Sequence, residues 1–75
     1  MVERIDYLKS LLLNVKDSYY AFVEGILVYA EKKQSRLDAV ILFIEMNPGA
    51  LSSDIVSFVS EQPDFYEDSV RTQAV

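Results

Sequence analysis

"LFIEMNPGALSSDIVSFVSEQPDF", residues 42–65, joins two short apolar segments through Asn-Pro-Gly-Ala. Proline cannot continue a helix, and it fixes φ at the first central position of a turn. Glycine can adopt the positive φ that a type II turn needs at the next position. The sequence therefore predicts a tight turn over residues 47–50 with Gly49 at positive φ. It also predicts a helix on each side, over about 36–46 and 53–61, the second capped by Ser52 or Ser53 and ended by Pro63.

The segment before this turn is continuously apolar from Val40 to Ile44. A strand is possible from residue propensity alone. Ser35 followed three residues later by Asp38 is an acidic variant of a capping box, which favours a helix start at this point. Asp38 and Glu45 flank the apolar run, and the sequence offers no partner strand for it. We therefore expect a helix here.

Apolar residues recur in alternating steps of three and four along the N-terminal half: Ile5, Leu8, Leu12, Val15, Tyr19, Phe22, Ile26 and Tyr29. This spacing is that of one helical stripe held over about four heptads. Two interpretations remain open: one long or kinked helix over about 3–33, or two helices broken near Asp17. The unbroken phase favours the long helix. The poor helix formers and good cap residues between Asn14 and Ser18 favour the break.

Residues 19–31 are apolar on nearly every side, which is typical of a buried helix. This helix is expected at the centre of the domain, with one face open to another subunit. Its large side chains outside the stripe form the candidate interface, which comprises Tyr20, Val23, Leu27 and Val28. Hydrophobic residues make up 51% of only 75 residues, too many for one small monomer to bury. The sequence thus predicts self-association, most simply as a homodimer. The alternative is that residues 2–15 fold back over this face and complete a monomeric four-helix core, which would go with the break near Asp17.

The residue types that carry most enzyme chemistry are missing from the chain. It has no Cys and no His, which excludes disulfides and the usual zinc ligand sets. Its two glycines stand far apart, so no glycine-rich phosphate loop is present. Asp17, Glu24 and Glu31 have the spacing of a solvated helix stripe. We identify no catalytic, cofactor-binding or metal-binding residue, and we expect no enzyme activity.

Charge is distributed unevenly along the chain. Residues 1–36 hold six Lys or Arg against five Asp or Glu, or +1, whereas residues 37–75 hold one Arg against seven acids, or −6, and together these give the formal net charge of −5. Proteins that bind nucleic acids need clustered positive charge to displace counterions from phosphate. The acidic second half therefore argues against binding to nucleic acid.

The stretch "ILFIEMNPGALSSDIVSFV" (residues 41–59) nevertheless resembles the helix 1–turn–helix 2 portion of winged-helix and related helix-turn-helix regulators. The resemblance covers about a quarter of the chain. It implies a DNA-binding regulator that uses residues 36–73, with base contacts from Ser69, Arg71, Thr72 and Gln73. Three acids surround those residues, and one Arg cannot supply the phosphate contacts that set the register on DNA.

These observations predict a single all-α domain over residues 1–75, a bundle of three to four helices with a frayed acidic and polar tail from about 64. Neither a signal peptide nor a membrane span is recognisable, so we expect a cytoplasmic protein. The preferred function is a non-enzymatic protein-protein interaction or regulatory module that associates with itself and with an unidentified protein partner, without a cofactor. A helix-turn-helix DNA-binding regulator is the alternative.

Overall fold

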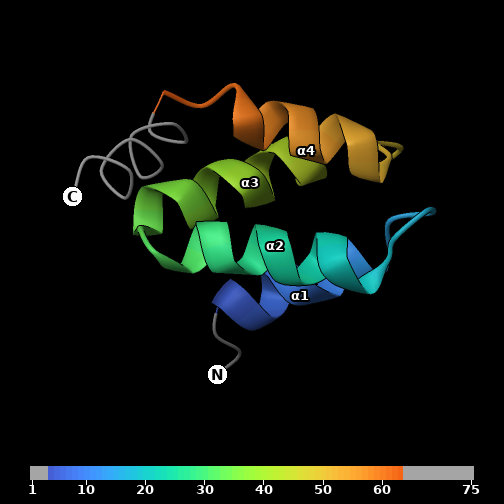
Figure 1. Cartoon of the computed structure of the whole chain (residues 1–75), viewed down its shortest axis with the longest axis horizontal. Helices are drawn as coiled ribbons and strands as arrows, with labels where there is room; N and C mark the ends of the chain where they lie inside the picture. The colour runs from blue at the N-terminus through green and yellow to red at the C-terminus, as the bar shows by residue number, and fades with distance from the viewer. Residues whose placement is uncertain (1–3, 64–75) are drawn as a thin grey trace.

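A computed structural model describes residues 4–63, which form four helices and no strand. They are α1 (Arg4–Leu13), α2 (Tyr20–Glu31), α3 (Gln34–Met46) and α4 (Ser52–Ser60). Helices α2 and α3 form a central pair, and α1 and α4 each pack against both of them, from opposite sides (Figure 1). The predicted all-α class and the helices on each side of the Asn-Pro-Gly turn are confirmed. The predicted tail from about 64 lies outside the described residues.

Of the two interpretations of residues 3–33, the one with two helices broken near Asp17 is confirmed and the one long or kinked helix is wrong, because residues 14–19 are not helical. The N–H groups of Val15 and Ser18 donate over three residues, to the carbonyls of Leu12 and Val15 at 3.2 and 3.0 Å. Tyr19 is extended, with φ −147° and ψ 161°, and α2 begins after it. One straight helix over residues 3–33 would leave most of the apolar surface of α2 exposed to solvent. Folding α1 back covers one face of α2, which offsets the helical hydrogen bonds that the break forgoes.

The core lies between α2 and α3 and is closed by apolar side chains from α1 and α4. Leu8 and Leu12 of α1 are fully buried, as is Ile55 of α4. The whole cluster comprises Leu8, Leu12, Phe22, Val23, Ile26, Tyr29, Ala30, Leu37, Val40, Ile41, Ile44, Ile55 and Val59. Six of the eight residues of the apolar stripe belong to this core or pack against it within α1 and α2. Each of the two short helices thus buries its own part of the stripe. The regular spacing of the stripe therefore did not require one continuous helix.

The N-cap predicted at Ser35 is wrong by two residues. Lys33 is the N-cap, with extended backbone angles, and α3 begins at Gln34. Asp38 therefore does not close a capping box with Ser35. Its carboxylate instead accepts hydrogen bonds from the side chains of Gln34 and Arg4, both at 3.0 Å. The competing contact to α1 explains why the local capping pattern is not used.

The turn between α3 and α4 exists as predicted, but its type differs. The N–H of Ala50 donates to the carbonyl of Asn47 at 2.9 Å, which closes a four-residue turn over Pro48 and Gly49. No glycine among the described residues has positive φ, so the prediction for Gly49 is wrong. Proline at the first central position suits type I turns as well as type II turns, and type I needs negative φ at both central residues. Gly49 therefore supplies no conformation that another residue could not adopt.

A stability measurement on Gly49→Ala tests this turn. A Cβ built at Gly49 meets no atom within 4 Å, and its backbone angle suits alanine. Alanine restricts the unfolded chain, so urea unfolding should show an unchanged free energy of unfolding or a gain of up to about 1 kcal/mol. A loss larger than about 1 kcal/mol would show that the position does need positive φ. The type II turn predicts such a loss, including for Gly49→Val.

Candidate interaction surfaces

Helix α4 is positioned by a contact with the loop that follows α1. One carboxylate oxygen of Asp17 accepts a hydrogen bond from the backbone N–H of Ser52 at 2.7 Å, and the other accepts from the Ser52 hydroxyl at 2.9 Å. Ser52 is the first residue of α4 and is buried. Because the first N–H groups of a helix have no partner inside the helix, an acceptor from elsewhere in the chain can cap it. Asp17 caps α4 in this way.

Two sequence-based predictions are corrected by this contact. Asp17 is exposed as predicted, but it lies in the loop before α2 and so does not share a helical stripe with Glu24 and Glu31. Nor does Ser52 or Ser53 act as the N-cap of α4, because Leu51 occupies that position. The carboxylate of Asp54 accepts a hydrogen bond from the N–H of Leu51 at 3.0 Å. The start of α4 is therefore held by two carboxylates, one local and one from the α1–α2 loop.

The four residues of the predicted interface lie in different environments. Tyr20 is 80% exposed and Val28 is 47% exposed, so both project from the outer side of α2. Leu27 is half-buried and packs against the core. Val23 is only 5% exposed, because it belongs to the core cluster that the α1 side chains also enter. Val23 is therefore not available to a second molecule in this structure.

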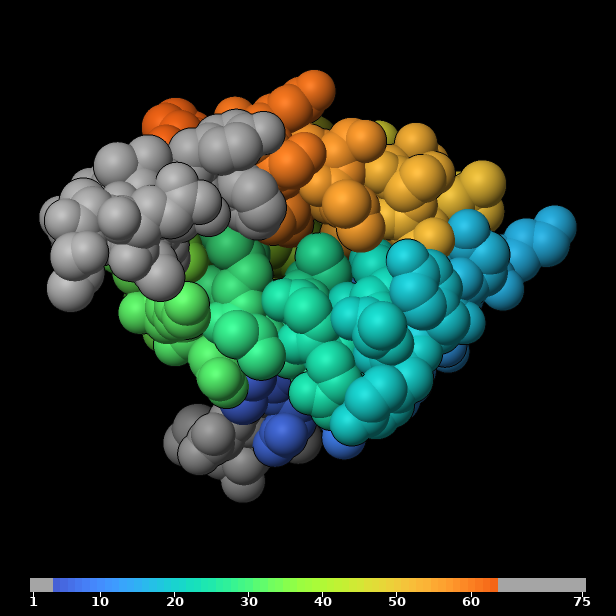
Figure 2. Space-filling view, in the orientation of Figure 1, coloured from blue at the N-terminus to red at the C-terminus, as the bar shows by residue number. Residues whose placement is uncertain are grey.

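Helices α2 and α4 lie side by side on one face of the molecule, with a hollow between them (Figure 2). This hollow has a volume of about 300 Å³. Its walls are largely apolar and include Phe22, Gly25 and Ile26 of α2 and Val56 and Val59 of α4. A Cβ built at Gly25 would meet no atom within 4 Å, so Gly25 faces open space and no neighbouring helix.

Exposed residues line this hollow, and other exposed apolar residues lie further around α2. We define the α2–α4 face as Tyr19, Tyr20, Ala21, Gly25, Val28 and Val56, all of which are exposed. Tyr19, Ala21, Gly25 and Val56 line the hollow itself. On the helical wheel, Glu24 and Glu31 lie between Val28 and Tyr20, so this face mixes apolar and charged side chains, as protein interfaces commonly do.

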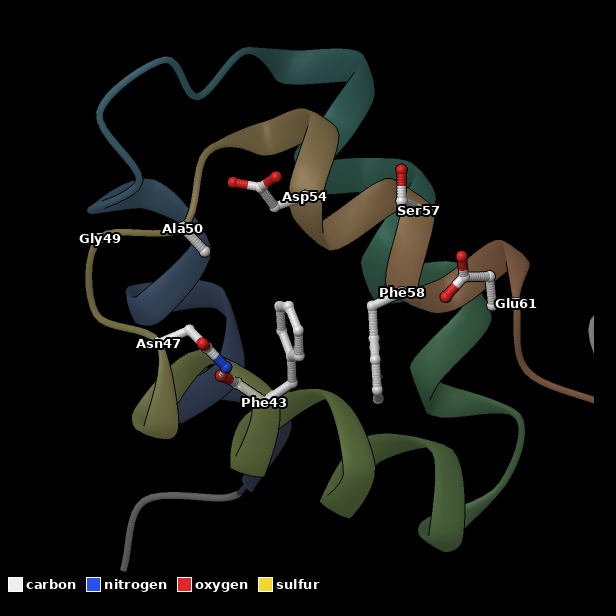
Figure 3. A pocket seen from close by; sticks show the side chains of 8 residues that line it. All are labelled: Phe43, Asn47, Gly49, Ala50, Asp54, Ser57, Phe58 and Glu61. Atoms are coloured by element: carbon white, nitrogen blue, oxygen red, sulfur yellow. Dashed lines mark hydrogen bonds between the residues drawn. The ribbon is translucent and has the colours of Figure 1, made fainter.

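A second groove, of about 520 Å³, lies between α3 and α4 beside the turn (Figure 3). The half-buried rings of Phe43 and Phe58 stack there with centroids 4.4 Å apart. The exposed carboxylates of Asp54 and Glu61 also line the groove. Sequence reasoning did not select these residues, although Phe43 and Phe58 occur at matching positions before the two prolines.

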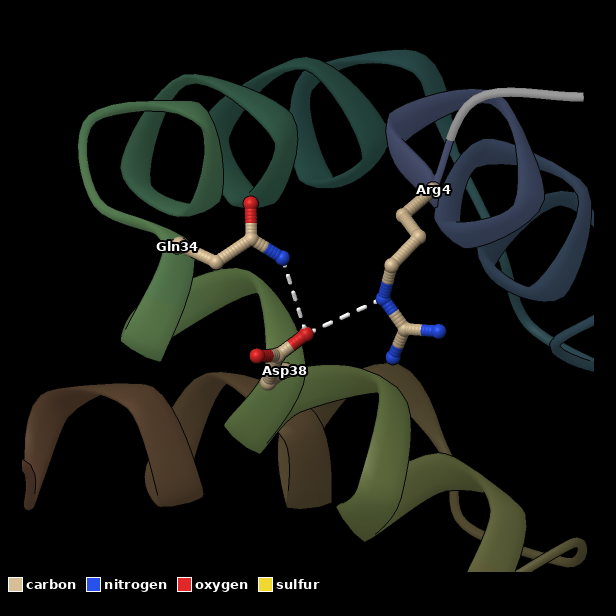
Figure 4. Close-up of polar contacts among 3 residues, drawn as sticks. All are labelled: Arg4, Gln34 and Asp38. Carbon is tan, nitrogen blue, oxygen red and sulfur yellow. Dashed lines mark hydrogen bonds and ion pairs between the residues drawn. The ribbon is translucent and has the colours of Figure 1, made fainter.

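Polar side chains fasten α1 to α3. Arg4 forms an ion pair with Asp38 at 3.0 Å, and Gln34 donates to the same carboxylate oxygen (Figure 4). Further along, the hydroxyl of Tyr7 donates to the Glu45 carboxylate at 2.6 Å. This hydrogen bond raises the pKa of Tyr7 above its ordinary value. Both pairs are exposed, so they select the position of α1 more than they stabilise it.

Arg36 is almost fully buried at the start of α3. Its guanidinium lies 4.5 Å from the centre of the Tyr29 ring and donates to the Tyr29 carbonyl at 3.4 Å. A buried cation over an aromatic face is a stabilising arrangement that also satisfies the end of α2. We therefore assign Arg36 to the joint between α2 and α3.

The residues predicted to contact bases, Ser69, Arg71, Thr72 and Gln73, lie outside the described residues. Within residues 4–63, no group of three or more acidic side chains could hold a metal ion. No helix in this part of the chain is long and apolar enough to cross a membrane. Comparison with models of protein families, with curated proteins and with solved structures gave no match.

The contact between Asp17 and Ser52 should make stability depend on acid. The two hydrogen bonds from Ser52 lower the pKa of Asp17 below its ordinary value of 3.8. Because the pKa of Asp17 is lower in the folded state, ionised Asp17 stabilises the protein fully above its ordinary pKa. This stabilisation is lost as pH falls through the folded-state pKa. Asp17→Asn should therefore lower the melting temperature at neutral pH, and the difference from the wild type should disappear well below pH 3.8.

Glu24→Gln is the matched control for this prediction, because Glu24 is an exposed carboxylate on α2 with no described hydrogen bond. It should leave the melting temperature at neutral pH nearly unchanged. Equal effects of the two substitutions, or a deficit in Asp17→Asn that persists in acid, would contradict the capping role of Asp17.

Proposed function

We propose that this protein is a small non-enzymatic interaction module of the cytoplasm that self-associates through the α2–α4 face. The observation that carries the proposal is the exposure of large apolar side chains around an open apolar hollow. Tyr20 and Val28 are the most exposed members from α2, and Val56 adds an exposed side chain from α4. Exposed apolar side chains beside an apolar hollow support an interface in a small protein.

The proposed interface differs from the one expected from the sequence. It keeps Tyr20 and Val28, omits the buried Val23, and shifts toward α4. The shift follows from the position of α1, which covers the opposite flank of α2. Twofold pairing is the most common arrangement of such faces, and it would use the same patch on both chains. A homodimer is therefore the expected assembly.

A DNA-binding regulator is the alternative that the α3–turn–α4 hairpin suggests. Against it, residues 37–63 hold four acids and no Lys or Arg. Phosphate contacts contribute most of the affinity of DNA-binding proteins, and they require cations on the contacting surface. The charge of the hairpin therefore favours the interaction module over the regulator.

Sedimentation equilibrium across a wide range of protein concentrations tests the proposal. The average mass of the wild-type protein should rise toward twice the chain mass. Val28→Asp should weaken association by about tenfold or more, because pairing would bury an unpaired carboxylate at a cost above about 1.4 kcal/mol. Circular dichroism should show unchanged helix content, because Val28 is 47% exposed in the monomer.

Leu42→Asp provides the matched control. Leu42 is 56% exposed on the outer side of α3, away from the α2–α4 face. This variant should associate like the wild type. A wild-type mass that stays monomeric at high concentration would refute self-association. Dissociation by Leu42→Asp with no effect of Val28→Asp would place the interface on α3.

A further inference from the structure

The groove between α3 and α4 is a second surface, distinct from the α2–α4 face. Its apolar floor is formed by the stacked rings of Phe43 and Phe58, with Ala50 beside them. Its polar groups are the carboxylates of Asp54 and Glu61 and the side chains of Asn47 and Ser57. In Figure 3 the two rings lie between the helices, while Asp54 and Glu61 come from opposite ends of α4.

The charge of this groove has no counterpart nearby in the chain. Residues 37–63 contain Asp38, Glu45, Asp54 and Glu61 but no Lys or Arg. The first two already face α1, where Arg4 and the Tyr7 hydroxyl contact them. Asp54 accepts one backbone hydrogen bond, and Glu61 makes no side-chain hydrogen bond or ion pair within the described residues. Within residues 4–63 neither Asp54 nor Glu61 is paired with a basic side chain, so in this part of the chain the groove presents negative charge beside an aromatic surface.

The spacing of the two carboxylates defines what fits them. Asp54 lies in the first turn of α4 and Glu61, seven residues later, is its C-cap, which places them about 10 Å apart along one side of the helix. Phe58 lies between them in sequence, so the aromatic floor lies between the two charges. A complementary partner has two cations about 10 Å apart with an apolar side chain midway. On a helix, that pattern is a basic residue at i and i+7 and an apolar residue between them.

We propose that the α3–α4 groove binds a basic amphipathic helix of a partner protein. Its two Arg or Lys side chains pair with Asp54 and Glu61, and its central apolar side chain packs on Phe43 and Phe58. Arginine suits the site because its guanidinium bonds carboxylates with two parallel N–H groups and also stacks on aromatic rings. This binding uses a different surface from self-association, so each can occur without the other.

Two peptides of matched composition test the proposal on the full chain. The first is an acetylated and amidated alanine-based helix with two Arg seven residues apart and Leu midway between them. The second has Gln in place of both Arg. Backbone amide shifts in NMR should map the first peptide to Phe43, Ala50, Phe58 and Glu61. The second should bind at least about fivefold more weakly, and the difference should shrink at high salt.

Glu61→Gln separates groove binding from general attraction to an acidic protein. Because Glu61 is exposed, this substitution should weaken binding of the Arg peptide only about two- to fivefold and leave binding of the Gln peptide unchanged. Glu24→Gln removes one negative charge from α2 and should change the affinity of neither peptide. Shifts centred on the α2–α4 face, equal binding of both peptides, or equal effects of Glu61→Gln and Glu24→Gln would each overturn the proposal. Shifts at the groove that appear with protein concentration alone would assign it to a second copy of this chain.

Discussion

The hydrogen bonds from Ser52 to Asp17 join the loop after α1 to the first turn of α4. This contact fixes how the loop after α1 and the start of α4 lie relative to each other. It requires residues 14–19 to leave the helix, so that Asp17 can reach α4, and the same departure lets α1 fold back onto α2 and α3. Because α4 packs on the central pair from the opposite side, fixing its first turn also fixes the hollow beside α2 and the groove beside α3.

The break between α1 and α2 determines which apolar side chains remain exposed. With α1 folded back, Val23 enters the core while Tyr20 and Val28 stay exposed. A continuous helix would have exposed all three. Folding back therefore buries part of the apolar surface within one chain. Exposed apolar side chains remain on the α2–α4 face and also elsewhere, as at Leu13, Leu42 and Met46.

Local patterns predicted the helices well and the contacts between them poorly. Pro48 and Pro63 marked helix ends correctly, and every residue of the stripe from Ile5 to Tyr29 except the exposed Tyr19 lies in the core or packs against it. The stripe could not reveal the break, because a turn of suitable length keeps the spacing unchanged. Nor could the sequence show that Asp17 binds Ser52, 35 positions away. The groove at Phe43 and Phe58 was not predicted for the same reason, because each phenylalanine in its own helix has the sequence pattern of an ordinary core residue.

A double-mutant cycle of Asp17→Ala and Ser52→Ala tests directly whether Asp17 stabilises the protein through its contact with Ser52. Each single substitution should lower the free energy of unfolding at neutral pH. Ser52→Ala should lower the free energy of unfolding clearly less in the Asp17→Ala background than in the wild type, because the Ser52 hydroxyl has then already lost its acceptor. Strictly additive losses would contradict the account, since they would show that the two residues stabilise the protein independently.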